Sequence, residues 1–434
     1  MPQRLNMRDP GFEAAFAAFL DAKREDDLDV NQTVGAILAE VRAKGDEAVI
    51  AYTQRFDNLT LTPETMLVSH DEIEKAVAAC PKDVLQALEL MAQRVSDFHS
   101  RQCPEDLDYS DDAGLKLGYR WTPIEAVGLY VPGGTAAYPS SVLMNALPAK
   151  VAGVDRLAMV VPAPSGNLSS LVLAAAKIAG IDEIYRVGGA QAVSALAFGT
   201  ATIAPVDKIV GPGNAYVAAA KRQVFGTVGI DMIAGPSEVL VVADGANDPR
   251  WIAADLLAQA EHDPSAQAIL ITTDMDFADA VLEAIDRHLD TLPRAEIARE
   301  SWDRFGAVVT VGKLDEAVRL IDRLAPEHLE LAIDDPETLA AKVRNAGAIF
   351  LGRHTPEALG DYVAGPNHVL PTSRSARFSS GLGVLDFVKR STFIGCDAEV
   401  LAKLGPAART LAEAEGLSAH ALSLSIRLEQ RGKD

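Results

Sequence analysis

Two polar residues near the end of a predicted helix are placed where they could bind a metal or a polar ligand. Asp248, with the proline after it, is a typical helix start, and Pro264 stops the helix. Gln259 and His262 lie three residues apart in the last turn and therefore share a face. An amide and an imidazole on one face could bind zinc. The alternative is an ordinary surface pair at a helix end.

A second candidate is the adjacent pair Glu327 and His328, which follows a proline at the entrance of a predicted strand. An imidazole, with an ordinary pKa near 6.5, could accept the hydroxyl proton in an alcohol oxidation. The carboxylate could then activate water. Because the chain turns at this point, both side chains could reach one substrate from different sides. The alternative is a salt-bridged pair on the surface.

Three glycine-containing loops follow strand-like segments and precede helix-like ones. In parallel α/β sheets, loops at the carboxyl ends of strands carry ligand-binding residues. One loop contains Gly-x-Gly, which is part of the dinucleotide fingerprint, but Tyr216 occupies the place of the third glycine. The usual glycine-cradled binding of a pyrophosphate is therefore not expected. The alternative is that each loop is a plain connection. The loops contain residues 133–134, 188–189 and 211–213.

The elements that must position these residues alternate between strand-like and helix-like from about residue 156 to 351. Such alternation is typical of parallel sheets with helices on their faces. Two successive blocks suggest a duplicated architecture, although the sequence contains no strong repeat. We therefore predict an α/β protein in four parts. These are a mainly helical N-terminal segment (1–115), a first α/β domain (116–245), a second α/β domain (246–372) and a small C-terminal module (373–434).

The composition limits the possible partners. The 434 residues carry a net charge of −21, which argues against binding to nucleic acid or to an anionic membrane. No apolar run is long enough to cross a bilayer, and the N-terminus does not resemble a signal peptide. The three cysteines are far apart, which suits a reducing compartment and excludes a thiolate zinc site. We expect a cytoplasmic protein.

The segment 230–238, with the sequence IDMIAGPSE, a strand, and a helix closing on Gln-x-x-His together resemble the signature of L-histidinol dehydrogenases. The resemblance extends over residues 25–425. It implies a homodimeric enzyme that uses NAD and one Zn²⁺ per subunit to oxidise L-histidinol to L-histidine through L-histidinaldehyde, at the end of histidine biosynthesis. It also implies two incomplete Rossmann-like domains.

The resemblance assigns roles to individual residues. The catalytic pair would be Glu327 and His328. The residues contacting NAD would be Tyr130, Gln191 and Asn214. The zinc ligands would be Gln259, His262, Asp361 and His420. The substrate contacts would be Ser237, Gln259, His262, His328, Asp361, Glu415 and His420. The C-terminal module would reach the active site of the partner subunit, so that the dimer shares its sites. Surface or packing roles are expected for His288, His354 and His368.

Three alternatives stay open. A related NAD-dependent dehydrogenase of another small hydroxy compound would keep the loops but change the substrate contacts. A zinc hydrolase would use Glu327 as the base for a metal-activated water and would need no nicotinamide. A non-catalytic α/β protein that binds a small molecule would turn nothing over.

Overall fold

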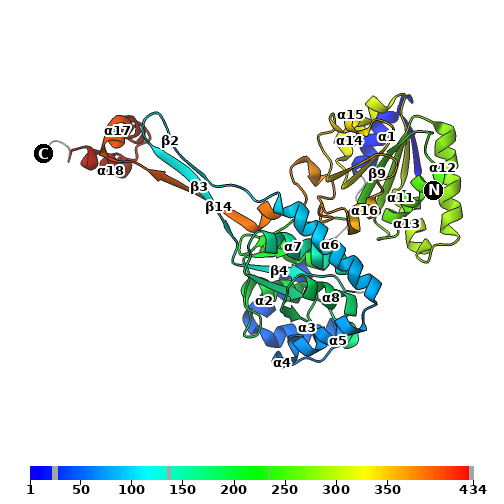
Figure 1. Cartoon of the computed structure of the whole chain (residues 1–434), viewed down its shortest axis with the longest axis horizontal. Helices are drawn as coiled ribbons and strands as arrows, with labels where there is room; N and C mark the ends of the chain where they lie inside the picture. The colour runs from blue at the N-terminus through cyan, green and yellow to red at the C-terminus, as the bar shows by residue number, and fades with distance from the viewer. Residues whose placement is uncertain (22–27, 134–137, 234, 430–434) are drawn as a thin grey trace.

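The structure is a computed structural model that describes residues 1–21, 28–133, 138–233 and 235–429. Figure 1 shows two α/β units side by side and an arm that projects from them to the C-terminal helices. Both units contain purely parallel sheets, and the arm is built on antiparallel strands. The predicted α/β class with two parallel sheets is therefore confirmed.

The sheet of the first unit has five strands in the order β6-β5-β4-β7-β8. Numbered along the chain, this order is 3-2-1-4-5, which is the Rossmann order without its sixth strand. The strands are short and almost fully buried, as expected for a sheet covered on both faces. They are β4 (Ala126–Tyr130), β5 (Arg156–Val160), β6 (Glu183–Tyr185), β7 (Lys208–Val210) and β8 (Gly229–Ile230).

The sheet of the second unit repeats this order. Five of its strands again follow the sequence 3-2-1-4-5, and one more strand from the N-terminus extends the edge. Two units of equal strand order support the predicted duplication, which the residues alone do not reveal. The strands are β1 (Gln3–Asn6), β9 (Glu238–Ala243), β10 (Gln267–Thr272), β11 (Ala307–Thr310), β12 (His328–Ala332) and β13 (Ala348–Leu351).

Helices cover both faces of each sheet. In β9, Val239 and Val241 face one apolar cluster, whereas Leu240 and Val242 face the other, as the alternation of a strand requires. Among the described residues, no helix combines the length and apolar content needed to span a bilayer. The helices of the first unit are α2 (Leu28–Lys44), α3 (Asp46–Asp57), α4 (Pro63–Met66), α5 (His70–Ala79), α6 (Lys82–Ser100), α7 (Pro139–Val151), α8 (Ser170–Ile178), α9 (Gly189–Phe198) and α10 (Ala215–Val224). Those of the second unit are α1 (Phe12–Asp21), α11 (Pro249–Ala260), α12 (Met275–Leu289), α13 (Ala295–Phe305), α14 (Leu314–Leu324), α15 (Pro336–Ala340) and α16 (Glu357–Tyr362).

The sheets depart from the predicted domain boundaries in three places. The first strand and helix belong to the second unit, because β1 pairs with β11 and the phenylalanines of α1 enter the core beneath it. The stretch 116–123 leaves the first domain and pairs with the C-terminal part of the chain. The strand β9, predicted at the end of the first domain, lies at the centre of the second sheet. Pairings over such sequence distances leave no local signal.

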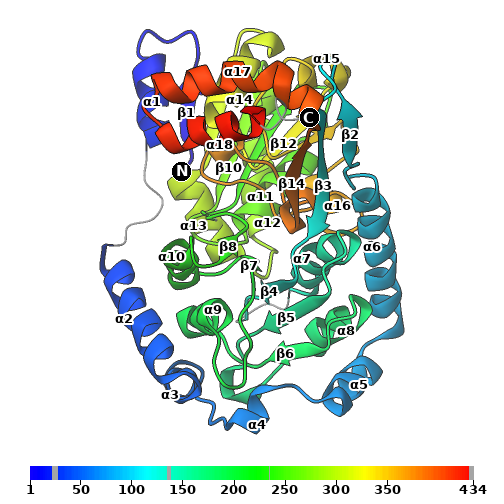
Figure 2. The ribbon, with the colours of Figure 1, turned by 90° about the vertical axis from the view of Figure 1, so that its left-hand side faces the viewer.

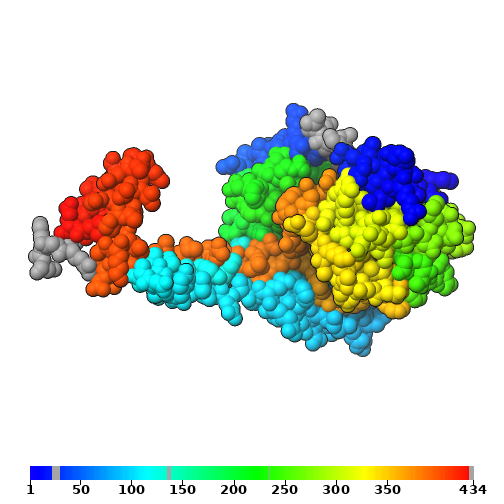
Figure 3. All heavy atoms as spheres, turned by 90° about the horizontal axis from the view of Figure 1, so that it is seen from above, coloured from blue at the N-terminus to red at the C-terminus, as the bar shows by residue number. Residues whose placement is uncertain are grey.

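The arm is a ribbon that carries two helices. Its strands are β2 (Leu107–Ser110), β3 (Lys116–Pro123) and β14 (Val388–Gly395), and all eight residues of β14 pair with β3. The helices α17 (Ala398–Ala414) and α18 (Ser418–Glu429) contact each other at its end. Figure 2 views the molecule from the side of the arm, and Figure 3 shows the narrow stalk between these helices and the body.

Candidate active site

Glu327 and His328 lie at the amino end of β12, between β9 and β13. The preceding helix α14 ends at Ala325, whose left-handed φ of 46° turns the chain into Pro326 and then into the strand. A non-glycine residue in this conformation costs roughly 1–2 kcal/mol, and such strain is typical of functional sites. Both side chains of the pair are almost fully buried, which excludes the surface pair considered from the sequence.

His328 is a neutral imidazole with one accepting nitrogen. Its Nδ1 lies 3.0 Å from the backbone oxygen of Glu238. Because a carbonyl only accepts, Nδ1 carries the hydrogen and Nε2 carries the lone pair. Nε2 is buried and has no hydrogen-bond partner among the described residues. Burial, together with the nearby His368 and His262, lowers the pKa of His328 to about 3. The ring is therefore neutral at pH 7, as a general base must be.

Glu327 is held by the same backbone. Its Oε2 accepts a hydrogen bond of 2.9 Å from the N–H of Glu238 and lies 3.9 Å from His328 Nδ1. The side chain of Glu238 in turn accepts a hydrogen bond of 3.1 Å from the N–H of Ser373. These contacts link the amino ends of β9 and β12 to the loop that contains Ser373. They also keep the Glu327 carboxylate beside the His328 imidazole.

Three acids that the sequence analysis missed surround this pair. Glu357 Oε1 lies 3.4 Å from His328 Nδ1, and the N–H of Glu357 donates to Glu330 Oε1 at 2.6 Å. Burial raises the pKa of both carboxyls well above the usual range, and neighbouring carboxylates raise it further. Burial also raises the pKa of Asp255, next to Glu330, to about 6. These acids therefore hold protons at higher pH than ordinary carboxyls, which limits the negative charge beside His328.

Three of the four predicted zinc ligands belong to this region. Gln259 ends α11, is fully buried, and neither of its amide atoms has a hydrogen-bond partner among the described residues. Burial raises the pKa of Asp361 on α16, and the charge of His262 opposes the rise. A buried polar group without a partner costs about 1–3 kcal/mol. The donor set therefore fits a bound cation.

A second group of donors overlaps with the first. Ligand atoms of His328, Glu357 and Asp361 lie within 4.8 Å of one another. Asp361 belongs to both groups. In the first group, Gln259 and His262 would complete the coordination. In the second group, His328 and Glu357 would complete it.

The remaining predicted contacts fall in two places. Ser237 is half-buried and immediately precedes β9, at the same sheet edge as Glu327. The Gly235 N–H donates to Thr372 Oγ1 at 2.7 Å, and a Cβ atom on Gly235 would lie 2.1 Å from Ser373 Oγ, so any other residue would displace the Ser373 hydroxyl. Glu415 ends α17 and His420 lies in α18, both exposed at the far end of the arm (Figures 1 and 3). The chain does not bring these two residues to its own site.

The residues predicted to contact NAD lie at the carboxyl edge of the first sheet. Tyr130 ends β4, and its hydroxyl accepts a hydrogen bond of 3.0 Å from the N–H of Gly189. Gln191 lies in the first turn of α9 after β6, is buried, and its Oε1 has no partner among the described residues. Asn214 caps α10 after β7 and accepts from the N–H of Tyr216 at 3.1 Å.

The glycines of the third loop are used for packing. A Cβ atom on Gly211 would lie 2.1 Å from the backbone oxygen of Tyr130, and one on Gly213 would lie 2.5 Å from Val217. Beneath this loop, Lys221 forms a buried ion pair with Asp231 and donates to the Gly211 carbonyl at 2.9 Å. The loop is therefore shaped by its own contacts.

The two regions meet where the units face each other. The side chain of Arg94 on α6 donates to the carbonyl of Ala364, just after α16, at 3.1 Å. Asn367 donates to the carbonyl of Met144 on α7 at 2.7 Å. Burial raises the pKa of Tyr362, and Asp361, Glu261 and Tyr138, at the start of α7, raise it further. The carboxyl edge of the first sheet thus lies next to the amino edge of the second.

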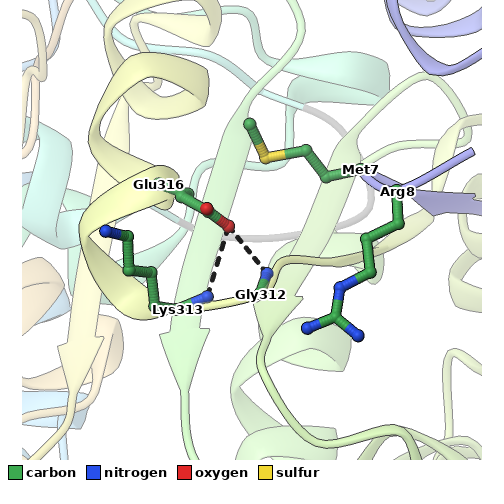
Figure 4. Close-up of a pocket in the computed structure, with 5 residues that line it drawn as sticks. All are labelled: Met7, Arg8, Gly312, Lys313 and Glu316. Atoms are coloured by element: carbon green, nitrogen blue, oxygen red, sulfur yellow. Dashed lines mark hydrogen bonds between the residues drawn. The ribbon is translucent and has the colours of Figure 1, made fainter.

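A surface pocket of about 280 Å³ lies elsewhere (Figure 4). It is lined by residues that follow β1 and β11, at the carboxyl edge of the second sheet, whereas Glu327 and His328 begin β12 at the opposite edge. The carboxylate of Glu316 accepts from the N–H groups of Gly312 and Lys313 at 2.8 and 3.3 Å. The start of α14 is therefore already capped by its own side chain, and the pocket takes no part in the site.

A strand order found twice and a buried acid–base pair between the two units define a two-domain α/β oxidoreductase. The model of the histidinol dehydrogenase family matches residues 20–428, and the chain belongs to that family.

Relatives agree over the full length of the chain. Histidinol dehydrogenases of Rhodospirillum rubrum and Ruegeria pomeroyi are 65% and 62% identical to it over 431 and 430 residues, which is 99% of each chain. The crystal structure of histidinol dehydrogenase from Elizabethkingia anophelis covers the whole chain and 99% of its own, with 36% identity and a TM-score of 0.95.

Proposed function

We propose that the protein oxidises L-histidinol to L-histidine through L-histidinaldehyde, with NAD as the oxidant and zinc bound at the site, as the end of histidine biosynthesis. The family and the names of the relatives support the substrate. The observation that carries the proposal is the buried neutral His328, whose Nε2 has no partner among the described residues and which lies beside Glu327.

The metal would be held by Gln259, His262 and Asp361, with His420 from a second subunit as the fourth ligand. When bound, zinc would fix and polarise the substrate, whose amine and imidazole are good zinc donors. The amide of Gln259, which has no hydrogen-bond partner among the described residues, and the effect of His262 on the pKa of Asp361 support this set.

NAD, the hydride acceptor, would lie along Tyr130, Gln191 and Asn214. The buried Oε1 of Gln191, which has no partner among the described residues, supports a polar ligand at this place. The facing arrangement of the two units would bring the dinucleotide next to the substrate.

The proton transfers would be carried out by side chains of the chain itself. His328 would accept the hydroxyl proton at Nε2, while the carbonyl of Glu238 keeps the ring in the right tautomer. Glu327 would take a proton from water in the second oxidation, so that water can attack the aldehyde carbon. The buried carboxyls of Glu330 and Glu357 would keep the surroundings of the imidazole close to neutral.

The exposed arm supports a dimer. An extended ribbon ending in two helices leaves apolar side chains uncovered, including Leu411, Leu417 and Leu422 at 65%, 43% and 60% exposure. Such a surface requires a partner. In a twofold dimer the exchange is reciprocal, and each arm would deliver Glu415 and His420 to the site of the other subunit.

The proposal is tested by measuring the stoichiometry of the reaction. Purified protein with zinc, histidinol and excess NAD should form about two NADH and one histidine for each histidinol consumed, as two successive oxidations require. One NADH with accumulating aldehyde contradicts the second oxidation. Absence of NADH returns the zinc hydrolase to consideration.

A further inference from the structure

Asp57 is a half-buried acid with no function in the proposed reaction. It is the last residue of α3, and its Oδ2 is buried and has no hydrogen-bond partner among the described residues. Burial raises the pKa of the carboxyl. A carboxylate at the end of a helix is also repelled by the negative end of the helix dipole. The position is therefore unfavourable for folding, which suggests a ligand as the reason for an acid there.

Asp57 ends a helix that packs next to the proposed NAD region. Burial raises the pKa of Tyr130, the last residue of β4, to about 12, and the charge of Asp57 adds to the rise. Its helix α3 contacts the short helix η1 (Pro164–Gly166), and Leu59 packs against Gly166. Because η1 follows β5, Asp57 lies beside the carboxyl end of the second strand.

In sheets with this strand order, the carboxyl end of the second strand has a known role in ligand binding. An acidic side chain after the second strand accepts hydrogen bonds from the hydroxyls of the adenosine ribose in many dinucleotide-binding proteins. In this chain, β5 is followed by Val161, Pro162, Ala163 and Pro164, none of which is acidic. The position normally held by that acid is thus vacant in the sheet, while Asp57 approaches it from another element.

We infer that Asp57 binds the adenosine ribose of NAD by accepting hydrogen bonds from its hydroxyls, and that it selects NAD over NADP. A carboxylate favours the two donors of a free ribose and repels a 2′-phosphate. The inference rests on the proposed NAD site and adds to it a binding and specificity residue supplied by α3.

The experiment uses the zinc-loaded full-length enzyme and compares NAD⁺ with NADP⁺. Their dissociation constants are measured by calorimetry and their KM values in the presence of histidinol. Asp57→Asn should weaken NAD⁺ binding by roughly 10-fold or more, the effect of a charged hydrogen bond, and leave kcat nearly unchanged. NADP⁺ should bind equally well or better, so that the preference for NAD⁺ falls. The thermal midpoint should not fall, because the variant removes an unfavourable carboxylate.

Glu47→Gln is the matched control, since it removes an exposed carboxylate from the first turn of the same helix. It should change neither dissociation constant. Unchanged NAD⁺ affinity in Asp57→Asn, or an unchanged preference over NADP⁺, overturns the inference while the proposed function stands. A wild-type enzyme that neither binds nor reduces NAD⁺ overturns both.

Discussion

The backbone of Glu238 orients both members of the Glu327–His328 pair. Its carbonyl accepts from His328 Nδ1, and its N–H donates to Glu327 Oε2. The two peptide groups that flank Glu238 at the start of β9 therefore set the imidazole tautomer and the place of the carboxylate. The two side chains can then act on different protons without competing for one hydrogen bond.

Glu327→Gln should separate their roles. The amide oxygen can still accept from the Glu238 N–H, so the geometry is kept, but the side chain can no longer take a proton from water. Oxidation of the aldehyde should slow by about a hundredfold or more, and removal of hydride from the alcohol should change little. Single turnovers with histidinaldehyde and with histidinol, followed by NADH absorbance, measure the two steps. Equal losses in both would contradict the division of roles, and Glu296→Gln, an exposed acid on α13, should leave both rates unchanged.

A second pair of variants identifies the metal ligands. His262→Asn removes a strong nitrogen donor, so its zinc affinity should fall by more than the roughly 10–100-fold that loss of an outer-shell partner costs. Glu357→Gln should retain zinc if Gln259, His262 and Asp361 hold it. Zinc content after dialysis is measured by elemental analysis, and circular dichroism checks the fold. The reverse pattern would assign the metal to His328, Glu357 and Asp361.

At the scale of secondary-structure elements, the sequence predicts those features that a local residue pattern encodes. The strand–helix alternation, the helix start at Asp248 and the loops around Gln191 and Asn214 are all local, and the structure contains them. Glu357 was missed because the residues around it look like an ordinary helix start, and its burial comes from elements distant in the sequence, including α11 and β12. Burial lowers the pKa of His368 to about 4, and His368 contributes to the lowered pKa of His328, so the surface or packing role expected for it stays a prediction.

The loop that carries Asn214 depends on the buried pair of Lys221 and Asp231, whose side chains are only 3% and 1% exposed. Lys221→Met leaves that carboxylate buried without its cation, so the free energy of unfolding should fall by about 3–5 kcal/mol. Adding Asp231→Asn removes the charge while keeping an acceptor for the Gly211 N–H, and should restore part of the loss.

Urea unfolding followed by circular dichroism measures these changes. Lys177→Met is the control, because its ion pair with Glu74 is exposed and should contribute at most about 1 kcal/mol. If Lys221→Met were no more destabilising than Lys177→Met, the buried pair would not hold the loop.

For the whole molecule, the features that sequence reasoning did not find are those that join distant segments. β1 pairs with β11 about three hundred residues later, and β3 pairs with β14 across a similar separation. Neither pairing changes the local hydrophobic pattern, so the domain boundaries expected near residues 115 and 245 differ from the sheets. The C-terminal module expected over residues 373–434 does not coincide with the arm, because Ser373 donates to Glu238 and Phe387 lies in the core of the first unit, so that only the part from β14 onward extends away from the body.

The arm leads to the last prediction, which concerns sharing of the site between subunits. His328→Ala and His420→Ala should each be inactive, since one removes the base and the other a metal ligand. In a hybrid dimer with exchanged arms, one site combines both defects and the other combines an intact body with an intact arm. Random pairing makes about half of the dimers hybrids, so the mixture should recover roughly a quarter of wild-type activity. Affinity tags of two kinds verify that hybrids form. A mixture that contains hybrids and stays inactive would mean that His420 serves its own chain.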